Sequence, residues 1–267
     1  MTDQARQELA AAIRTAAEWL QVREVKAAPK RDAGEPSRAV KEKFDKALQK
    51  LLNQHFQQQA DIVKRYLEAG GRLPLPDDLF NSAFVQADVT RLLIDAVQHG
   101  IFDVTSQTGF TIDNTLTNKR AAEWAARYAG ELIKDVDKTS LEMVRSAVSL
   151  FADKPGFTLA DVMNQLPYDV ARSERIAVTE ITRAYAEANQ IAGEELRDEF
   201  GDVPVVKVWF TNNDDRVCDI CGQLDGQEIS IDENFVYETK DGKKIEVANP
   251  PGHVSCRCWT TTTTKIN

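Results

Sequence analysis

The sequence predicts an α+β protein with a helical N-terminal body and a small, mostly β C-terminal domain that is stapled by zinc. Through the first two hundred residues, apolar side chains recur at helical spacings of three and four. After Gly201 the period changes to two, which is typical of strands. All four cysteines lie within the last fifty residues. We therefore divide the chain into an N-terminal helix with a flexible linker (1–35), a helical domain (36–200) and a Cys/His-rich β domain (201–267).

Start and stop signals set the limits of the helices. Ser37 suits an N-cap, and Gly70 and Gly71 stop the helix that follows it. His99 and Gly100 resemble a basic last turn followed by a C′ glycine, so we interpret His99 as a helix-end cation. The pattern predicts helices over residues 1–26, 37–69, 77–99, 113–136, 138–152, 158–166 and 169–200.

The last of these helices has two regular faces. Its apolar stripe should face the core and contains Ala177, Ile181, Tyr185, Ala188, Ala192 and Leu196. The opposite side aligns Arg172, Arg175, Thr179 and Arg183. This polar line is either an ordinary solvated face or a contact surface that holds the β domain or another subunit through carboxylates. We predict a contact surface.

The C-terminal region reads as short strands joined by turns. A β-branched and aromatic run covers residues 203–211, and residues 224–227 mark a turn. Residues 235–247 form a predicted hairpin that turns at Asp241 and Gly242, and a closing strand begins at Trp259.

Five soft or borderline metal ligands fall in this β region, which has too few residues to be stable on its core alone. They are Cys218, Cys221, His253, Cys256 and Cys258. A tetrahedral ion takes four such ligands, which favours one structural zinc over a catalytic one. Cys256 and Cys258 would face the same way on a strand, so either one completes the set. Two disulfides, or unliganded buried thiols, remain the alternatives.

Charge and hydropathy limit the classes of partner. With 33 Lys and Arg against 42 Asp and Glu, the net charge is -9, which argues against a protein that coats nucleic acid or anionic lipid. The basic stretch between Arg23 and Lys50 is a solvated segment or a weak contact with DNA or an acidic partner. No apolar run is long enough to span a bilayer, and the N-terminus lacks the pattern of a secretory signal, so we expect synthesis in a cytosol.

No catalytic set is evident, and we expect no enzymatic activity. The chain has three histidines and none of the zinc-protease, serine-hydrolase or phosphate-loop motifs. His55 lies on the apolar side of a helix and is interpreted as a core or boundary residue. Two rival functions stay open: a zinc-ribbon nucleic-acid binder, and a metal-dependent hydrolase with Glu246 or Asp219 as general base.

Several spaced motifs in one order resemble the phage Mu F-like head morphogenesis proteins. The resemblance covers about residues 130–267. Its elements are Tyr168-Asp-x-Ala-Arg172-Ser-Glu174-Arg175, Thr179-Glu180-x-x-Arg183, Val208-Trp209, Asp214-x-x-x-Cys218-x-x-Cys221, Leu224-x-Gly226 and Pro250-x-x-His253-x-x-Cys256-x-Cys258.

This resemblance implies a minor head protein of a tailed double-stranded DNA phage or prophage. Such a protein acts in head assembly near the portal, with roles in DNA packaging or ejection. The implied partners are the portal protein and the scaffold or major capsid protein. The implied locations are the host bacterial cytoplasm during assembly and then the phage head.

Overall fold

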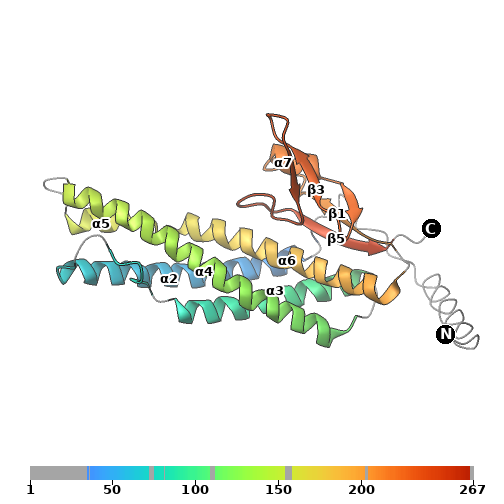
Figure 1. Ribbon diagram of the computed structural model, residues 1–267, viewed down its shortest axis with the longest axis horizontal. Coiled ribbons are helices and arrows are strands. Elements are labelled where there is room, and N and C mark those ends of the chain that lie inside the picture. Colours follow the sequence, from blue (N-terminus) through green and yellow to red (C-terminus); the bar gives the residue numbers. More distant parts are fainter. Residues whose placement is uncertain are drawn as a thin grey trace, which may run out of the picture.

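The computed structural model has the predicted α+β architecture. It describes Glu35 and residues 37–71, 75–80, 82–108, 112–153, 158–201 and 204–264. Long helices form an elongated body, and a compact region of short strands sits on one side of it (Figure 1). The helix expected over residues 1–26 lies outside the described residues. No helix in the described part of the chain has both the length and the apolar character needed to cross a bilayer.

The helical body contains five described helices, most of them close to their predicted limits. What was expected as two helices, over 113–136 and 138–152, is one continuous helix, because no glycine or proline lies at the expected break near Asp137. A Thr158 capping box with Asp161 starts the short helix that follows. The helices are α2 (Arg38–Glu68), α3 (Ala83–Thr108), α4 (Asn114–Asp153), α5 (Leu159–Asn164) and α6 (Val170–Phe200).

Helix α3 does not end at Gly100, so the predicted C′ glycine is wrong. The helix starts at Ala83 and continues through Gly100 to Thr108. A Cβ at Gly100 would lie 2.6 Å from the Cβ of Ala188, so this glycine permits close packing of α3 on α6. His99 is consequently in mid-helix, with Nδ1 3.3 Å from the Asp103 carboxylate, and is not a helix-end cation.

The core forms where α2, α3 and α4 surround α6. Leu48, Leu93 and Ile133 come from the three surrounding helices and are fully buried. His55 is buried too, and its Nε2 lies 2.6 Å from Asp137 Oδ1 on α4, which confirms its assignment to the core. The predicted stripe of α6 is buried throughout: Ala177, Ile181, Tyr185, Ala188, Ala192 and Leu196.

The C-terminal region is built on one antiparallel three-stranded sheet in the order β2-β1-β5. A separate hairpin turns at Gly242, as predicted, and a short helix that was not expected begins directly after Cys218. Val205 and Ile231 belong to the same apolar core as the helices, which anchors the sheet on α6. The elements are β1 (Val205–Phe210), α7 (Asp219–Leu224), β2 (Glu228–Ser230), β3 (Phe235–Glu238), β4 (Lys244–Val247) and β5 (Trp259–Thr264).

Close packing at Gly100 predicts that alanine at this position destabilises the protein, although helix propensity favours alanine. Propensity alone favours Gly100→Ala by up to about 1 kcal/mol, but the clash with Ala188 should reverse the sign and cost about 1–3 kcal/mol. Gly130→Ala in α4 is the control, because a Cβ there meets only the flexible end of Gln86, at 3.0 Å. Chemical denaturation measures both. A Gly100→Ala variant as stable as the wild type would contradict the close approach.

Candidate metal centre and its junction with the helical body

All five predicted metal ligands converge at one end of the β region. Cys218 caps the N-terminus of α7, where its sulfur accepts a hydrogen bond from the Cys221 backbone N–H at 3.5 Å. His253, Cys256 and Cys258 lie on the segment that leads into β5. The fold therefore brings together two groups of ligands that are distant in sequence. One group lies at the start of α7 and the other in the loop before β5.

The donor atoms form two overlapping triads that share Cys221. In the first, the sulfurs of Cys218 and Cys221 each lie 3.1 Å from His253 Nε2. In the second, Cys221 Sγ lies 3.7 Å from Cys256 Sγ, with Cys258 completing the group. Within each triad all donor atoms are within 4.8 Å of one another. Two sulfurs on one zinc tetrahedron are separated by about 3.8 Å, so the Cys221–Cys256 spacing fits shared coordination. The cluster can hold a metal ion.

The surroundings of the cluster suit thiolate and imidazole ligands. Cys221, Cys256 and Cys258 are buried in a small apolar core with Trp209 and other side chains of the β region. His253 Nδ1 donates to the Val254 carbonyl at 2.7 Å, which leaves Nε2 free to bind metal.

The two candidate fourth ligands, Cys256 and Cys258, share hydrogen bonds with each other and with Cys221. Bonds from the thiols of Cys221 and Cys258, and from the backbone N–H groups of Cys258 and Gly252, lower the pKa of Cys256 despite its burial. A bond from Cys221 lowers the pKa of Cys258, but its bond to Cys256 and its burial outweigh that effect and raise the pKa to about 12. The sulfur spacing of 3.7 Å from Cys221 to Cys256 is the observation that favours Cys256 as the ligand.

Trp209 gives a further sign of a negative centre. Its indole N–H is buried with no well-formed hydrogen bond to any described residue. The indole nevertheless lies close enough to Cys258 to favour the charged form of that thiol. An anionic sulfur accepts hydrogen bonds better than a neutral thiol, so Cys258 as a metal-bound thiolate would offer this orphaned donor a partner, which keeps Cys258 open as the alternative fourth ligand.

The four residues of the predicted polar line of α6 do not share one contact surface but face different surroundings. Arg172 donates to Ser140 Oγ at 3.0 Å and to the Pro167 carbonyl at 3.1 Å, and its guanidinium lies 4.8 Å from the centre of the Phe56 ring. It therefore ties the start of α6 to α4 and α2. Arg175 is exposed.

Thr179 and Arg183 face different elements. The Thr179 hydroxyl accepts a hydrogen bond from the Ser255 backbone N–H at 2.8 Å, and so reaches the loop that carries the metal ligands. Arg183 donates to Glu180 at 3.1 Å and lies 5.4 Å from the centre of the Tyr128 ring, on the side of α4. Of the four residues, Thr179 is the one that the described contacts join to the β region.

The sheet packs on a stripe of α6 whose centre lies about 60–80° around the helix from Arg172 and Arg183, while Arg175 lies on the line of the stripe, about one turn before its first residue. A Cβ at Gly193 would lie 2.5 Å from Ile231, and the Asn189 carbonyl accepts a hydrogen bond from Thr262. The stripe consists of Thr179, Thr182, Ala186, Asn189 and Gly193. Sequence reasoning missed it because small and polar residues at helical spacing give no apolar signal.

Two buried charged groups were also missed. Glu180 is 8% exposed and accepts hydrogen bonds from Tyr128 and Arg183. Its place three residues before Arg183 could have indicated an ion pair between the two side chains. Lys207 is 3% exposed and donates to Gln190 at 3.1 Å and to the Ala248 carbonyl at 2.9 Å. A single lysine inside the apolar run of β1 could have indicated this internal role.

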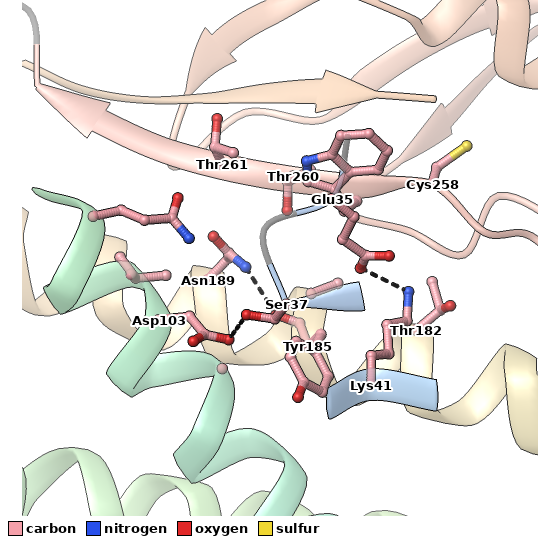
Figure 2. A pocket seen from close by; sticks show the side chains of 15 residues that line it. Glu35, Ser37, Lys41, Asp103, Thr182, Tyr185, Asn189, Cys258, Thr260 and Thr261 are labelled. Carbon is pink, nitrogen blue, oxygen red and sulfur yellow. Dashed lines mark hydrogen bonds and ion pairs between the residues drawn. The ribbon is translucent and has the colours of Figure 1, made fainter. Parts of the chain in front are cut away.

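A small polar cavity lies between β5 and the helices (Figure 2). It encloses about 30 Å³, and a buried Lys41–Glu35 ion pair of 3.0 Å lies at its edge. Thr182, Thr260 and Thr261 are among the residues that line it, and their hydroxyl groups have no hydrogen-bond partner among the described residues. The volume suits two or three water molecules. Cys258 also lines this cavity, so the metal cluster and the helical body meet here.

Comparison with known proteins gives one match. The family model described as phage Mu protein F like protein matches residues 128–261, about half of the chain. The chain belongs to the phage Mu protein F-like family. It is therefore a phage head morphogenesis protein. No curated protein and no solved structure matches the chain.

The Mu F-like segment runs from Tyr128 in α4 to Thr261 in β5. It contains every predicted metal ligand, the polar line of α6, Glu180 and Lys207. Helices α2 and α3 lie outside it, although they bury the apolar stripe of α6. The family segment thus folds against helices that the match does not include, and the polar cavity marks part of that boundary.

Asp45 lies near this boundary, in a cleft shared with arginines of α2 and of the β region. Its Oδ1 is buried and has no partner among the described residues. Burial is the main reason that the pKa of this carboxyl is raised to about 7; Lys41 opposes the shift, and Glu35 and Glu42 add to it. The folded protein therefore binds a proton at Asp45 that the unfolded chain has lost above about pH 4.

Asp45 should make stability fall as pH rises. Between about pH 4 and pH 7 the native state holds more protons than the unfolded state, so this group lowers the unfolding free energy by up to about 1.4 kcal/mol per pH unit. Asp45→Asn should remove that slope and gain stability over the wild type toward pH 7, in denaturation curves taken across this range. Asp61→Asn, on the exposed face of α2, is the control. Parallel profiles for the wild type and Asp45→Asn would contradict the raised pKa.

Proposed function

We propose that this Mu F-like protein is a minor head protein that acts without catalysis in head assembly beside the portal. The observation that carries the proposal is the family match over residues 128–261. The protein works in the host bacterial cytoplasm during assembly and remains in the virion. Its principal partner is the portal protein, with scaffold or major capsid protein as further partners, and it assists DNA packaging or ejection.

Within this role, the Cys/His cluster binds one zinc ion through Cys218, Cys221, His253 and Cys256. The 3.1 Å and 3.7 Å donor spacings and the buried, hydrogen-bonded Cys256 sulfur support this set. A bound zinc would crosslink the start of α7 to the segment before β5. Cys258 remains a neighbouring thiol at the edge of the polar cavity.

The donor set and its neighbours favour a structural role over hydrolysis. Four protein ligands fill a zinc tetrahedron and leave no position for a reactive water. The two candidate general bases are engaged elsewhere: Asp219 pairs with Lys240 at 3.4 Å, and Glu246 accepts a hydrogen bond from Asn234 at 3.1 Å.

Contact with DNA is weak in this proposal. Lys41 is buried against Glu35 and is not available to phosphates. Lys43, Lys46 and Lys50 remain exposed on α2 at helical spacing. Residues 23–34 of the basic stretch lie outside the described part of the chain; the three described lysines, on a protein of net charge -9, favour salt-sensitive, non-specific binding.

Elemental analysis of protein purified without chelator should find about one zinc per chain. Cys256→Ser should lower that content several-fold, whereas Cys258→Ser should keep it, because the zinc shell is complete without Cys258. The free thiols of the metal-free wild type are counted by thiol titration in the same experiment. A metal-free protein without free thiols would show two disulfides instead, and zinc loss in Cys258→Ser alone would reverse the ligand assignment.

Particles from prophage-induced or infected cells test the assembly role. The wild type should be recovered in procapsids together with the portal protein. Cys218→Ser should reduce its incorporation several-fold, because the β region loses its crosslink. Lys240→Ala, at a side chain that is 92% exposed, is the matched control in the same region. A wild-type protein that stays free and is excluded from particles would contradict the assembly role.

A further inference from the structure

Two large aromatic side chains are exposed on one line of α3. Phe84 is 88% exposed and Phe102 is 65% exposed. They are 18 residues apart, which is five full helical turns, so they project from the same face at a separation of about 27 Å. Soluble surfaces contain single exposed apolar residues without special cause, but two in register on one helix mark the ends of a defined surface.

The residues between these phenylalanines follow the same line. Asp88, Arg91 and Asp95 are exposed and Gln98 is half-buried, all within about 40° of the line. None of the three charged side chains has an ion-pair partner in the part of the chain that the structure describes. We call this surface the outer stripe of α3; it consists of Phe84, Asp88, Arg91, Asp95, Gln98 and Phe102.

The outer stripe is complementary to itself when reversed. In an antiparallel pair centred between Arg91 and Asp95, Phe84 of one copy lies opposite Phe102 of the other. Asp88 then lies opposite Gln98, and Arg91 opposite Asp95. Each of these contacts occurs twice, because a two-fold axis makes both sides of the interface the same patch.

We propose that the outer stripe is a self-recognition surface through which two copies of this chain pair their α3 helices in antiparallel orientation. The aromatic rings meet at both ends of the contact, where each covers the other from water. Two Arg91–Asp95 pairs form across its centre and set the register. The crossing must be close to antiparallel, because a steep angle would separate the terminal phenylalanines.

A second copy fits this surface better than an unrelated helix. Each exposed group of the stripe finds a suitable partner in the same stripe read backwards, and both carboxylates face a cation or an amide. A parallel arrangement in register would place each charge opposite its like and oppose association. The pairing involves neither the Mu F-like segment, which begins at Tyr128, nor the metal ligands.

Sedimentation equilibrium from about 1 to 200 µM tests the pairing with full-length protein. The wild type should show a monomer–dimer equilibrium within this range. Arg91→Asp alone and Asp95→Arg alone should each weaken association by at least about tenfold, since each places two like-charge contacts at the centre. The double variant Arg91→Asp/Asp95→Arg should restore dimerisation, because the swapped charges again face opposites.

A charge swap elsewhere is the matched control. Lys119→Glu/Glu123→Lys exchanges an exposed ion pair on α4 and should leave the dimer unchanged. Phe84→Ser should weaken association by a similar factor to the charge variants, with circular dichroism showing an unchanged helical content. A wild type that is monomeric at every concentration would overturn the proposal. So would a dimer that tolerates both single charge reversals, or one that the double swap fails to restore.

Discussion

The burial of α6 on two adjoining faces is the constraint on which the rest of the structure depends. One face packs against α2, α3 and α4, and a close contact occurs where Gly100 meets Ala188. The other meets the sheet, where Gly193 lies against Ile231. A helix packed this closely on both sides needs small residues at each contact, because interiors have little free volume and bulky side chains cannot interdigitate at such short separations. Helical body and β region are therefore held together mainly through one element.

The second face of α6 differs from the first in chemistry. The core face is apolar and complete, whereas the contact with the sheet is largely polar and carries hydroxyl groups without partners among the described residues. Lys207 and the Lys41–Glu35 pair are buried close to it. Buried charges give directional contacts at a cost in solvation, so they fix how the β region sits on the helices more than they strengthen its attachment. Such an interface specifies one arrangement of the Mu F-like segment.

The cluster of cysteines and His253 completes this arrangement at the end of the sheet. The sheet shares Val205 and Ile231 with the helical core, but the far part of the β region has only a small apolar core around Trp209 and Phe235. The ligands of the cluster come from the start of α7 and from the segment before β5. Along the chain these two segments are separated by β2 and the β3–β4 hairpin. Thr179 contacts this same segment through Ser255, so α6 and the cluster position one loop together.

Sequence alone determined the α+β class, the apolar stripe of α6, the five candidate metal ligands and the family, because each depends on periodicity or spacing along one segment. It failed where two segments meet. Gly100 has the local signature of a helix end, but close packing against Ala188 keeps it inside α3. The stripe that receives the sheet, the inward turn of Lys41, the burial of Glu180 and the grouping of the ligands around Cys221 depend on long-range contacts. No local pattern encodes such contacts, since the same residues would suit a solvated surface until the opposing element is in place.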